Sequence, residues 1–300
     1  MMPIIVPGLF GRYSYWQRIT DTTHDTTHDS THHSTHKAVP ERLHMIEILN
    51  PSQLVRAKAT GKLVGHVLQT MKERTKVGTN LLEIDQWTKD MINAAGAVSC
   101  YVDYAPSFGD GPFGHYICTS VNDAVLHGLP RDYTLVDGDL LSLDLAFLKD
   151  GVASDSAISF IVGESRPAES VKMIETTQRA LAAGIAVAGP GARIGDISHA
   201  VGEVLSGAGY PINGDFGGHG IGTTMHQDPH VPNTGRPHRG YKLRPGLLLA
   251  IEPWVMVDTD ELITDADGWT LRSATGCRTA HSEHTIAITD DGAEILTLAN

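Results

Sequence analysis

Apolar residues recur at helical spacing in the segment that follows residue 50. Intervals of one and three positions separate Leu63, Val64, Val67, Leu68 and Met71. This spacing predicts an amphipathic helix over about 51–73. The sequence Asn-Pro-Ser-Gln at 50–53 supports that start, because it places an N-cap residue before a proline, with glutamine at the third helical position. A second helix should run over about 81–95 and end at Gly96.

The same helical pattern returns in the second half of the chain. The segment GTNLLEIDQWTKDMINAAG (78–96) aligns without a gap with GARIGDISHAVGEVLSGAG (191–209). Each copy follows another predicted helix, near 51–73 and near 168–187. Because pairs of helices recur in the same order, we interpret the chain as an internal duplication.

Two strand-like segments also recur, and each of them carries an acid at the same place. The first pair is GDLLSLD (138–144) with GLLLAIE (246–252), and the second is SDSAISF (154–160) with SEHTIAI (282–288). Asp144 therefore matches Glu252, and Asp155 matches Glu283. In each half, two predicted helices are followed by predicted strands that carry two carboxylates. This order predicts a duplicated α+β fold around a central antiparallel sheet, with the four acids converging near a pseudo-two-fold axis.

These acids interrupt strongly apolar runs. Asp144 lies in LLSLDLAFL, and Glu252 lies in LLLAIEPWV. The residues Lys-Asp-Gly at 149–151 predict a hairpin turn that returns Asp155 to within about one residue of the position opposite Asp144. Whether both face the same side depends on a bulge, which the sequence does not determine. Buried carboxylates without partners are costly, so these acids need cations, protons or a metal.

Histidines provide the remaining candidates. His219 lies in GGHGIGTTMHQDPH, where glycines surround it and allow close approach of a ligand. His226 follows seven residues later, and His127 in VNDAVLHGLP is a third candidate on weaker grounds. Four acids and a histidine suit one or two divalent cations such as Mn, Fe, Co or Zn. Two metals about 3.5–4 Å apart would need bridging carboxylates, which four acids can provide.

Composition narrows the possible partners and location. The chain has 300 residues, is 41% hydrophobic and carries a formal net charge of −12. Because an acidic surface repels phosphate, we expect no direct nucleic-acid binding. No apolar run reaches the roughly 18 residues of a membrane span, and the start lacks the order of a secretory signal. With Cys100, Cys118 and Cys277 too few for a disulfide framework, we expect reduced thiols and a cytoplasmic protein.

The first part of the chain differs from the rest. Residues 23–36 read THDTTHDSTHHSTH, a low-complexity tract that cannot build a core. Histidine-rich tracts can bind metal, but an inert tail is the more economical interpretation. We therefore expect a disordered tail over 1–44 and a catalytic domain over 45–300.

Taken together, the motifs resemble those of a known family. They are SVNDAVLHGLP, DGDLLSLDLAFLKDGVASD, GGHGIGTTMHQDP, LLLAIEP, DGWT and SEHTIAIT, in that order. From about residue 46 to 298 the chain resembles the type I methionine aminopeptidases, which have the pita-bread fold. The resemblance implies a metallopeptidase that removes the N-terminal methionine of peptides and nascent proteins. It also implies a monomer that acts near the ribosome.

The resemblance assigns roles to individual residues. It implies five ligands of two divalent metal ions (Co, Mn, Fe or Zn), namely Asp144, Asp155, His219, Glu252 and Glu283. Asp155 and Glu283 would bridge the two metals, Asp144 would complete one site, and His219 with Glu252 would complete the other. The implied catalytic residues are His226 at the substrate carbonyl, His127 near the scissile nitrogen, and Glu252. The implied methionine pocket consists of Tyr104, Cys118, Met225 and Trp269.

Two departures from the family pattern bear on the pocket. The segment between Tyr104 and Cys118 is longer than usual, and Met225 stands where an aromatic residue is common. Two alternatives stay open. A proline-specific or other peptidase of the same fold would usually carry a large N-terminal domain, which a 44-residue polar tail cannot supply. A non-catalytic interaction protein would be expected to have lost ligands, and none is lost.

Overall fold

The predicted helices are present in the computed structural model, which describes residues 46–107 and 109–299. The tail predicted for 1–44 lies outside these residues. The helices are α2 (Pro51–Arg74), α3 (Leu81–Ala94), α4 (Ala168–Val187) and α5 (Ile194–Gly207). The start of α2 is the predicted capping box, because the Asn50 side chain accepts from the Gln53 N–H at 3.0 Å. In return, Gln53 Oε1 accepts from the Asn50 N–H at 2.9 Å.

One curled antiparallel sheet dominates the β structure. Among the described residues it has nine strands, of which seven follow the order β1-β4-β5-β13-β8-β6-β7, while β14 pairs with β13 and β2 with β4. These strands are β1 (Val98–Ser99), β2 (Cys118–Val121), β4 (Leu140–Lys149), β5 (Val152–Ile161), β6 (Gly217–Ile221), β7 (Gln227–Pro232), β8 (Leu248–Ile251), β13 (Glu283–Thr289) and β14 (Gly292–Ile295). Smaller sheets contain β3 (Ala124–Leu126), β9 (Trp254–Met256), β10 (Leu262–Thr264), β11 (Leu271–Ser273) and β12 (Thr279–His281).

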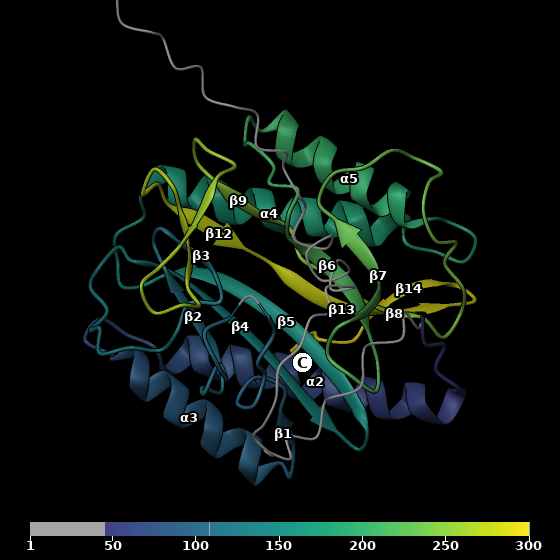
Figure 1. The fold of residues 1–300 in the computed structure, drawn as a ribbon, viewed down its shortest axis with the longest axis horizontal. Helices are drawn as coiled ribbons and strands as arrows, with labels where there is room; N and C mark the ends of the chain where they lie inside the picture. Colours follow the sequence, from purple (N-terminus) through teal and green to yellow (C-terminus); the bar gives the residue numbers. More distant parts are fainter. Residues whose placement is uncertain (1–45, 108, 300) are drawn as a thin grey trace, which may run out of the picture.

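The internal duplication is visible in the sheet. Helices α3 and α5 begin and end at matching positions of the aligned repeats. In the middle of the sheet the strands run β4-β5-β13-β8, so the matched strands β5 and β13 are neighbours and β4 and β8 flank them. This order is symmetric about the β5–β13 pair, as the predicted pseudo-two-fold relation between the halves requires (Figure 1). The predicted duplicated α+β fold is therefore confirmed.

The hairpin between β4 and β5 sets the register of the first two acids. It is a two-residue turn at Asp150 and Gly151, both with positive φ (50° and 77°), as a type I′ turn requires. The register places Asp144 opposite Ala157 and Asp155 opposite Ala146, without a bulge. The two acids are therefore two positions out of direct opposition rather than one. Because side chains alternate along a strand, that offset keeps both on one face.

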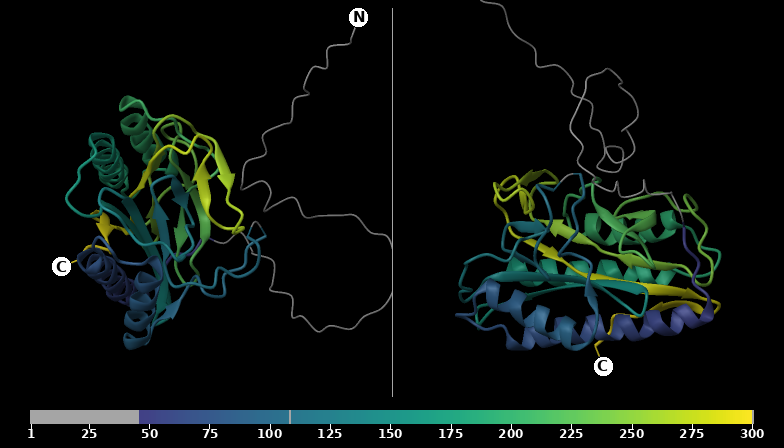
Figure 2. Two further views of the ribbon diagram at one scale, coloured as in Figure 1. Left: turned by 90° about the vertical axis from the view of Figure 1, so that its left-hand side faces the viewer. Right: turned by 60° about the horizontal axis from the view of Figure 1, so that its bottom comes forward.

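The helices cover one face of the sheet, and the acids lie on the other. The left view of Figure 2 shows α2 and α3 below and α4 and α5 above, all on one side of the strands. Leu143 and Phe147 of β4 pack into the core with Val64 and Leu68 of α2. Asp144 alternates with these apolar residues, so it points away from the helices.

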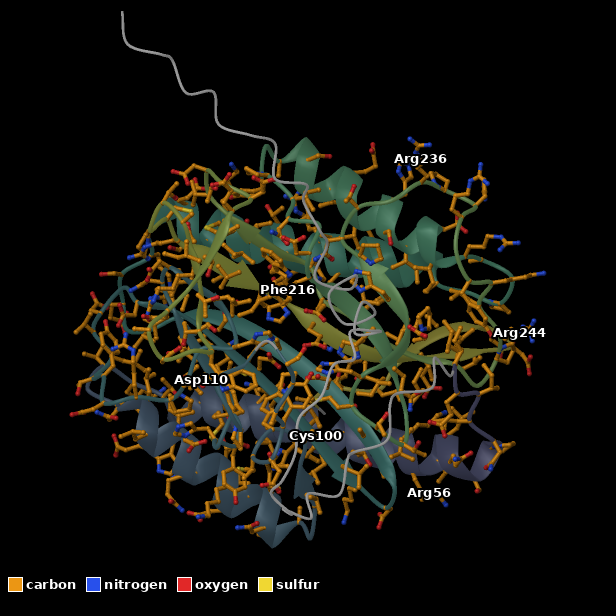
Figure 3. All side chains as sticks on the ribbon, in the orientation of Figure 1. Arg56, Cys100, Asp110, Phe216, Arg236 and Arg244 are labelled. Atoms are coloured by element: carbon orange, nitrogen blue, oxygen red, sulfur yellow. The ribbon has the colours of Figure 1, made fainter. Side chains whose placement is uncertain are left out.

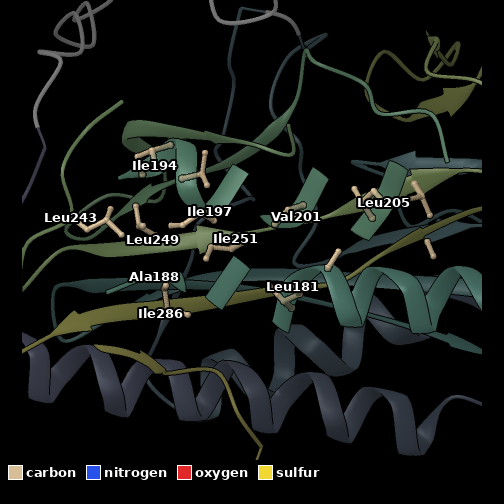
Figure 4. Packing of buried hydrophobic residues seen from close by; sticks show 14 of the residues in the cluster. Leu181, Ala188, Ile194, Ile197, Val201, Leu205, Leu243, Leu249, Ile251 and Ile286 are labelled. Carbon is tan, nitrogen blue, oxygen red and sulfur yellow. The ribbon is translucent and has the colours of Figure 1, made fainter. Parts of the chain in front are cut away.

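The second half packs in the same way. Figure 4 shows Leu181 of α4 and Ile197 and Val201 of α5 beside Ile251 of β8 and Ile286 of β13. None of the helices in the described part of the chain is long and apolar enough to cross a membrane. The apolar faces of these helices are instead used against the sheet.

Candidate metal centre

Five neighbouring strands each present one of the predicted ligands. Asp144 lies on β4, Asp155 on β5 and Glu283 on β13, Glu252 follows the last residue of β8, and His219 lies on β6. These strands are consecutive in the sheet. Since alternation selects one face of each strand, residues spread over 140 positions of sequence meet at one place.

The histidine is oriented by its own strand. Nδ1 of His219 lies 2.9 Å from the carbonyl oxygen of Gly220, which can only accept, so Nδ1 carries the proton. Nε2 therefore presents its lone pair to the acids. It lies 3.8 Å from Asp155 Oδ2 and 3.9 Å from Glu252 Oε1. Such a backbone contact is the usual way in which proteins orient a metal-binding imidazole.

The acids are poorly compensated by protein cations. Within the described residues, the basic atoms recorded within 4.0 Å of them are ring nitrogens of His219 and His281. Burial and, to a smaller extent, the charge of Asp144 raise the pKa of Glu252 to about 8. Burial and the other acids raise the pKa values of Asp155 and Glu283 well above their ordinary range. A cation in their midst would remove this cost.

Asp144 is the least perturbed of the four acids. Burial raises its pKa to about 6, and hydrogen bonds from Tyr101, Asp155 and Cys118 oppose that rise. Tyr101 Oη donates to Asp144 Oδ1 at 2.6 Å, and this short bond stabilises the ionised form.

The donor set fits divalent metal ions. Three groups have ligand atoms within 4.8 Å of one another: Asp144–Asp155–Glu283, His219–Glu252–Glu283 and Asp155–His219–His226. The first two groups share Glu283. Oε1 of Glu283 is buried and has no hydrogen-bond partner among the described residues, which is costly unless a ligand satisfies it. Carboxylate oxygens with imidazole nitrogen suit Mn, Fe, Co or Zn.

The other two predicted histidines have different neighbours. The His226 ring lies 4.4 Å from the His219 ring, centroid to centroid, and Nδ1 of His226 is 3.0 Å from Tyr104 Oη. His127 follows β3 in a left-handed conformation (φ 55°), and its ring contacts Phe216 and Trp269. Burial lowers the pKa of His127 to about 4, so its imidazole is neutral at physiological pH.

All four residues predicted to line a side-chain pocket lie in one apolar cluster. Cys118, Met225 and Trp269 are buried in it, and Tyr104 packs against it. Phe113, from the long segment between Tyr104 and Cys118, joins them with its ring 5.1 Å from that of Trp269. In Figure 3, Cys100, which packs against this cluster, and Phe216, whose ring contacts that of His127, lie towards the middle of the view, whereas Arg56, Arg236 and Arg244 lie at its edge.

The sequence prediction missed two residues that contact the acids. Tyr101 donates to Asp144, and His281 has Nε2 3.8 Å from Glu252 Oε2 and 4.0 Å from Glu283 Oε2. His281 could have been found, because it lies two positions before Glu283. Tyr101 lies outside any strand that carries an acid, so no spacing pointed to it.

Replacing Tyr101 with Phe should weaken metal binding by about 10-fold or more, because partners that orient ligands contribute on that scale. The hydroxyl that donates to Asp144 would be lost while the ring would remain. Competition titration with a chelator measures the affinity. Tyr210→Phe is a matched control, since Tyr210 donates to Glu169 at 2.8 Å, away from the acids. Equal affinity in the two variants would contradict the orienting role of Tyr101.

The fold and the site together define the class of a metal-dependent hydrolase. The sequence profile of metallopeptidase family M24 matches residues 56–290. The methionine aminopeptidase of Clostridium acetobutylicum is 40% identical, over 85% of this chain and 99% of the relative. The crystal structure of methionine aminopeptidase from Thermotoga maritima superposes with a TM-score of 0.80 at 34% identity, covering 85% of this chain and all of that chain.

The chain belongs to metallopeptidase family M24 and, within it, to the methionine aminopeptidases. The prolidase of Pyrococcus horikoshii shares the fold with a TM-score of 0.66 at 19% identity, and this chain covers 64% of its length. That likeness shows the common pita-bread fold alone. The resemblance found in the motifs is therefore confirmed at the level of family and fold.

Proposed function

We propose that this chain removes N-terminal methionine from peptides and nascent proteins with two divalent metal ions held by the five donors. The observation that carries the proposal is the pair of donor groups that share Glu283, one with Asp144 and Asp155 and the other with His219 and Glu252. A shared carboxylate suits two ions at bridging distance, about 3.5–4 Å. The family supports a metallopeptidase, and the donor chemistry supports Co, Mn, Fe or Zn.

We assign proton transfer and the contacts with the scissile peptide to three residues at or near the donor set. When bound, the metals supply a water acidic enough to act as a nucleophile near neutral pH. Glu252 follows β8 and is more exposed than Asp155 or Glu283, and we assign it the transfer of a proton towards the leaving nitrogen. His226, next to His219, would donate a hydrogen bond to the carbonyl oxygen of the scissile peptide. His127, neutral through burial, would contact the scissile nitrogen.

Recognition of the methionine side chain is assigned to the apolar cluster beside the acids. Tyr104, Cys118, Met225 and Trp269 offer polarisable sulfur and aromatic surface, which suits a thioether. Tyr104 connects this cluster to the donor set through its contact with His226. The side chain of the first residue and its peptide carbonyl would therefore be held by adjacent groups.

The cellular setting is part of the proposal. We assign the catalytic domain to residues 45–300 and expect a monomer that meets nascent chains near the ribosome. The free thiols of Cys100, Cys118 and Cys277 are compatible with activity in the cytoplasm.

The test is methionine release from Met-Ala-Ser by metal-stripped protein, before and after addition of Mn, Fe, Co or Zn. Methionine release should depend on the metal. A proline-containing peptide without an N-terminal methionine should not be cleaved. Metal-dependent cleavage of the proline peptide alone would support the metal centre but overturn the substrate assignment. No cleavage with any metal would favour a non-catalytic interaction protein.

A further inference from the structure

A short segment before helix α2 contacts the loop at 222–226, which carries the proposed site residues Met225 and His226. We name residues 46–49 the N-terminal strap. Leu49 is buried, and its N–H donates to the Gly246 carbonyl at 2.8 Å. It also packs with Ile221 of β6 and Leu248 of β8. The strap is therefore held in place by the strands that lead to His219 and Glu252.

Glu47 extends from the strap to residues 222–227. Its Oε2 accepts three hydrogen bonds: from the Thr223 N–H at 2.8 Å, the Thr223 hydroxyl at 3.0 Å and the Gln227 amide at 2.9 Å. Burial alone would raise the pKa of Glu47, but these bonds lower it below its ordinary value, so the side chain is ionised at neutral pH. Charge-assisted bonds of this kind are the strong ones.

The backbone of the loop is shaped for this contact. A Cβ at Gly222 would overlap Glu47 Oε2, so the carboxylate occupies the space that a side chain would need. The Gly222 N–H donates to the Thr224 carbonyl at 3.1 Å, and the Gly222 carbonyl accepts from Ala153 of β5 at 2.7 Å. The Glu47 carboxylate, Gly222 and the start of β5 thus meet at one point.

The same loop carries Met225 and His226 in its next residues. Met225 is buried in the apolar cluster with Trp269, and His226 contacts Tyr104 and His219. Only one residue separates Thr223, which Glu47 holds, from Met225. A displacement at Thr223 therefore moves the groups assigned to the methionine side chain and the peptide carbonyl.

We propose that Glu47 is a positioning residue of the active site, which fixes the 222–226 loop so that Met225 and His226 face the substrate. The inference rests on the proposed function for what the loop contacts. Glu47 itself touches neither substrate nor metal donors. Its effect should therefore appear in catalysis and in side-chain selectivity, and not in metal affinity.

The first test compares Glu47→Ala and Glu47→Gln with the wild-type full-length chain loaded with Mn. For Met-Ala-Ser, kcat/KM should fall by about 10-fold or more in Glu47→Ala, since small displacements of positioned groups cost up to about 100-fold. Glu47→Gln, which keeps the size and one acceptor, should lose less. The preference for methionyl over leucyl peptides should also fall, because Met225 moves with the loop. Glu294→Gln, at an exposed ion pair with Lys58, is the control.

The second test is hydrogen exchange of the peptide that covers 222–227, which needs no activity. Exchange should be faster in Glu47→Ala than in the wild type, because the Thr223 amide loses its acceptor. Unchanged exchange would overturn the contact, and faster exchange with unchanged kcat/KM and selectivity would overturn the positioning role. If the wild type released no methionine, the proposed function would fail, while exchange would still decide whether Glu47 holds the loop.

Discussion

Replacing Asp155 with Asn should reduce kcat/KM for methionine release by more than about 100-fold. Residues that merely orient metal ligands contribute 10- to 100-fold, so loss of a donor at the centre of the set should cost more. Asp155 belongs to two of the three donor groups and lies 3.8 Å from His219. Release of methionine from Met-Ala-Ser at a fixed metal concentration measures the effect.

Stability provides a second readout for the same variant. Added metal should stabilise the wild type, by about 2.7 kcal/mol at a hundred times the dissociation constant, and should stabilise Asp155→Asn far less. Without metal the variant should be at least as stable as the wild type at pH 8, because one buried carboxylate with a raised pKa is gone. Thermal unfolding with and without Mn separates these effects.

Asp139→Asn is a matched control for this experiment. Asp139 is as buried as Asp155, with 4% exposure for each, but it accepts hydrogen bonds from Asn122, Tyr133 and the Val136 N–H, away from the donor set. Asp139→Asn should lower stability by about 1–3 kcal/mol and leave the metal-induced increase intact. If Asp155→Asn retained wild-type release and stabilisation, the assignment of the metal centre would be wrong.

Three of the proposed donors stand out in the sequence because each violates a local rule. Asp144 and Glu252 interrupt apolar strands, and the glycines around His219 mark a close approach. The duplication then paired the acids, and the sheet order confirms that the matched strands flank one axis. Such signals lie within a few residues of each donor, so a single sequence can show them.

Contacts between distant segments were not predictable in this way. Tyr101 reaches Asp144 from outside the repeats, and Glu47 reaches Thr223 across 176 positions of sequence. The two-residue offset between Asp144 and Asp155 depends on the turn that Asp150 and Gly151 adopt. These features follow from tertiary packing, which apolar spacing describes only in outline.

The metal-free protein should lose stability as the pH rises from about 6.5 to 8. The pKa of Glu252 is raised to about 8, and those of Asp155 and Glu283 are raised well above their ordinary values. In this range the folded state therefore retains protons that the unfolded state has released. Since the folded state binds more protons, the free energy of unfolding falls with pH, by roughly 2 kcal/mol for each retained proton over this window.

Below about pH 6.5 the buried histidines oppose this slope. Burial lowers the pKa of His127 and His284 to about 4, so the unfolded state binds protons that the folded state does not. Bound metal requires ionised carboxylates, so it should abolish the loss between pH 6.5 and 8. Urea unfolding at pH 6 and pH 8, with chelator and with Mn, measures the change in stability without and with metal. Equal stability of the metal-free protein at the two pH values would show that the acids are not held protonated, and would remove the electrostatic argument for a cation among them.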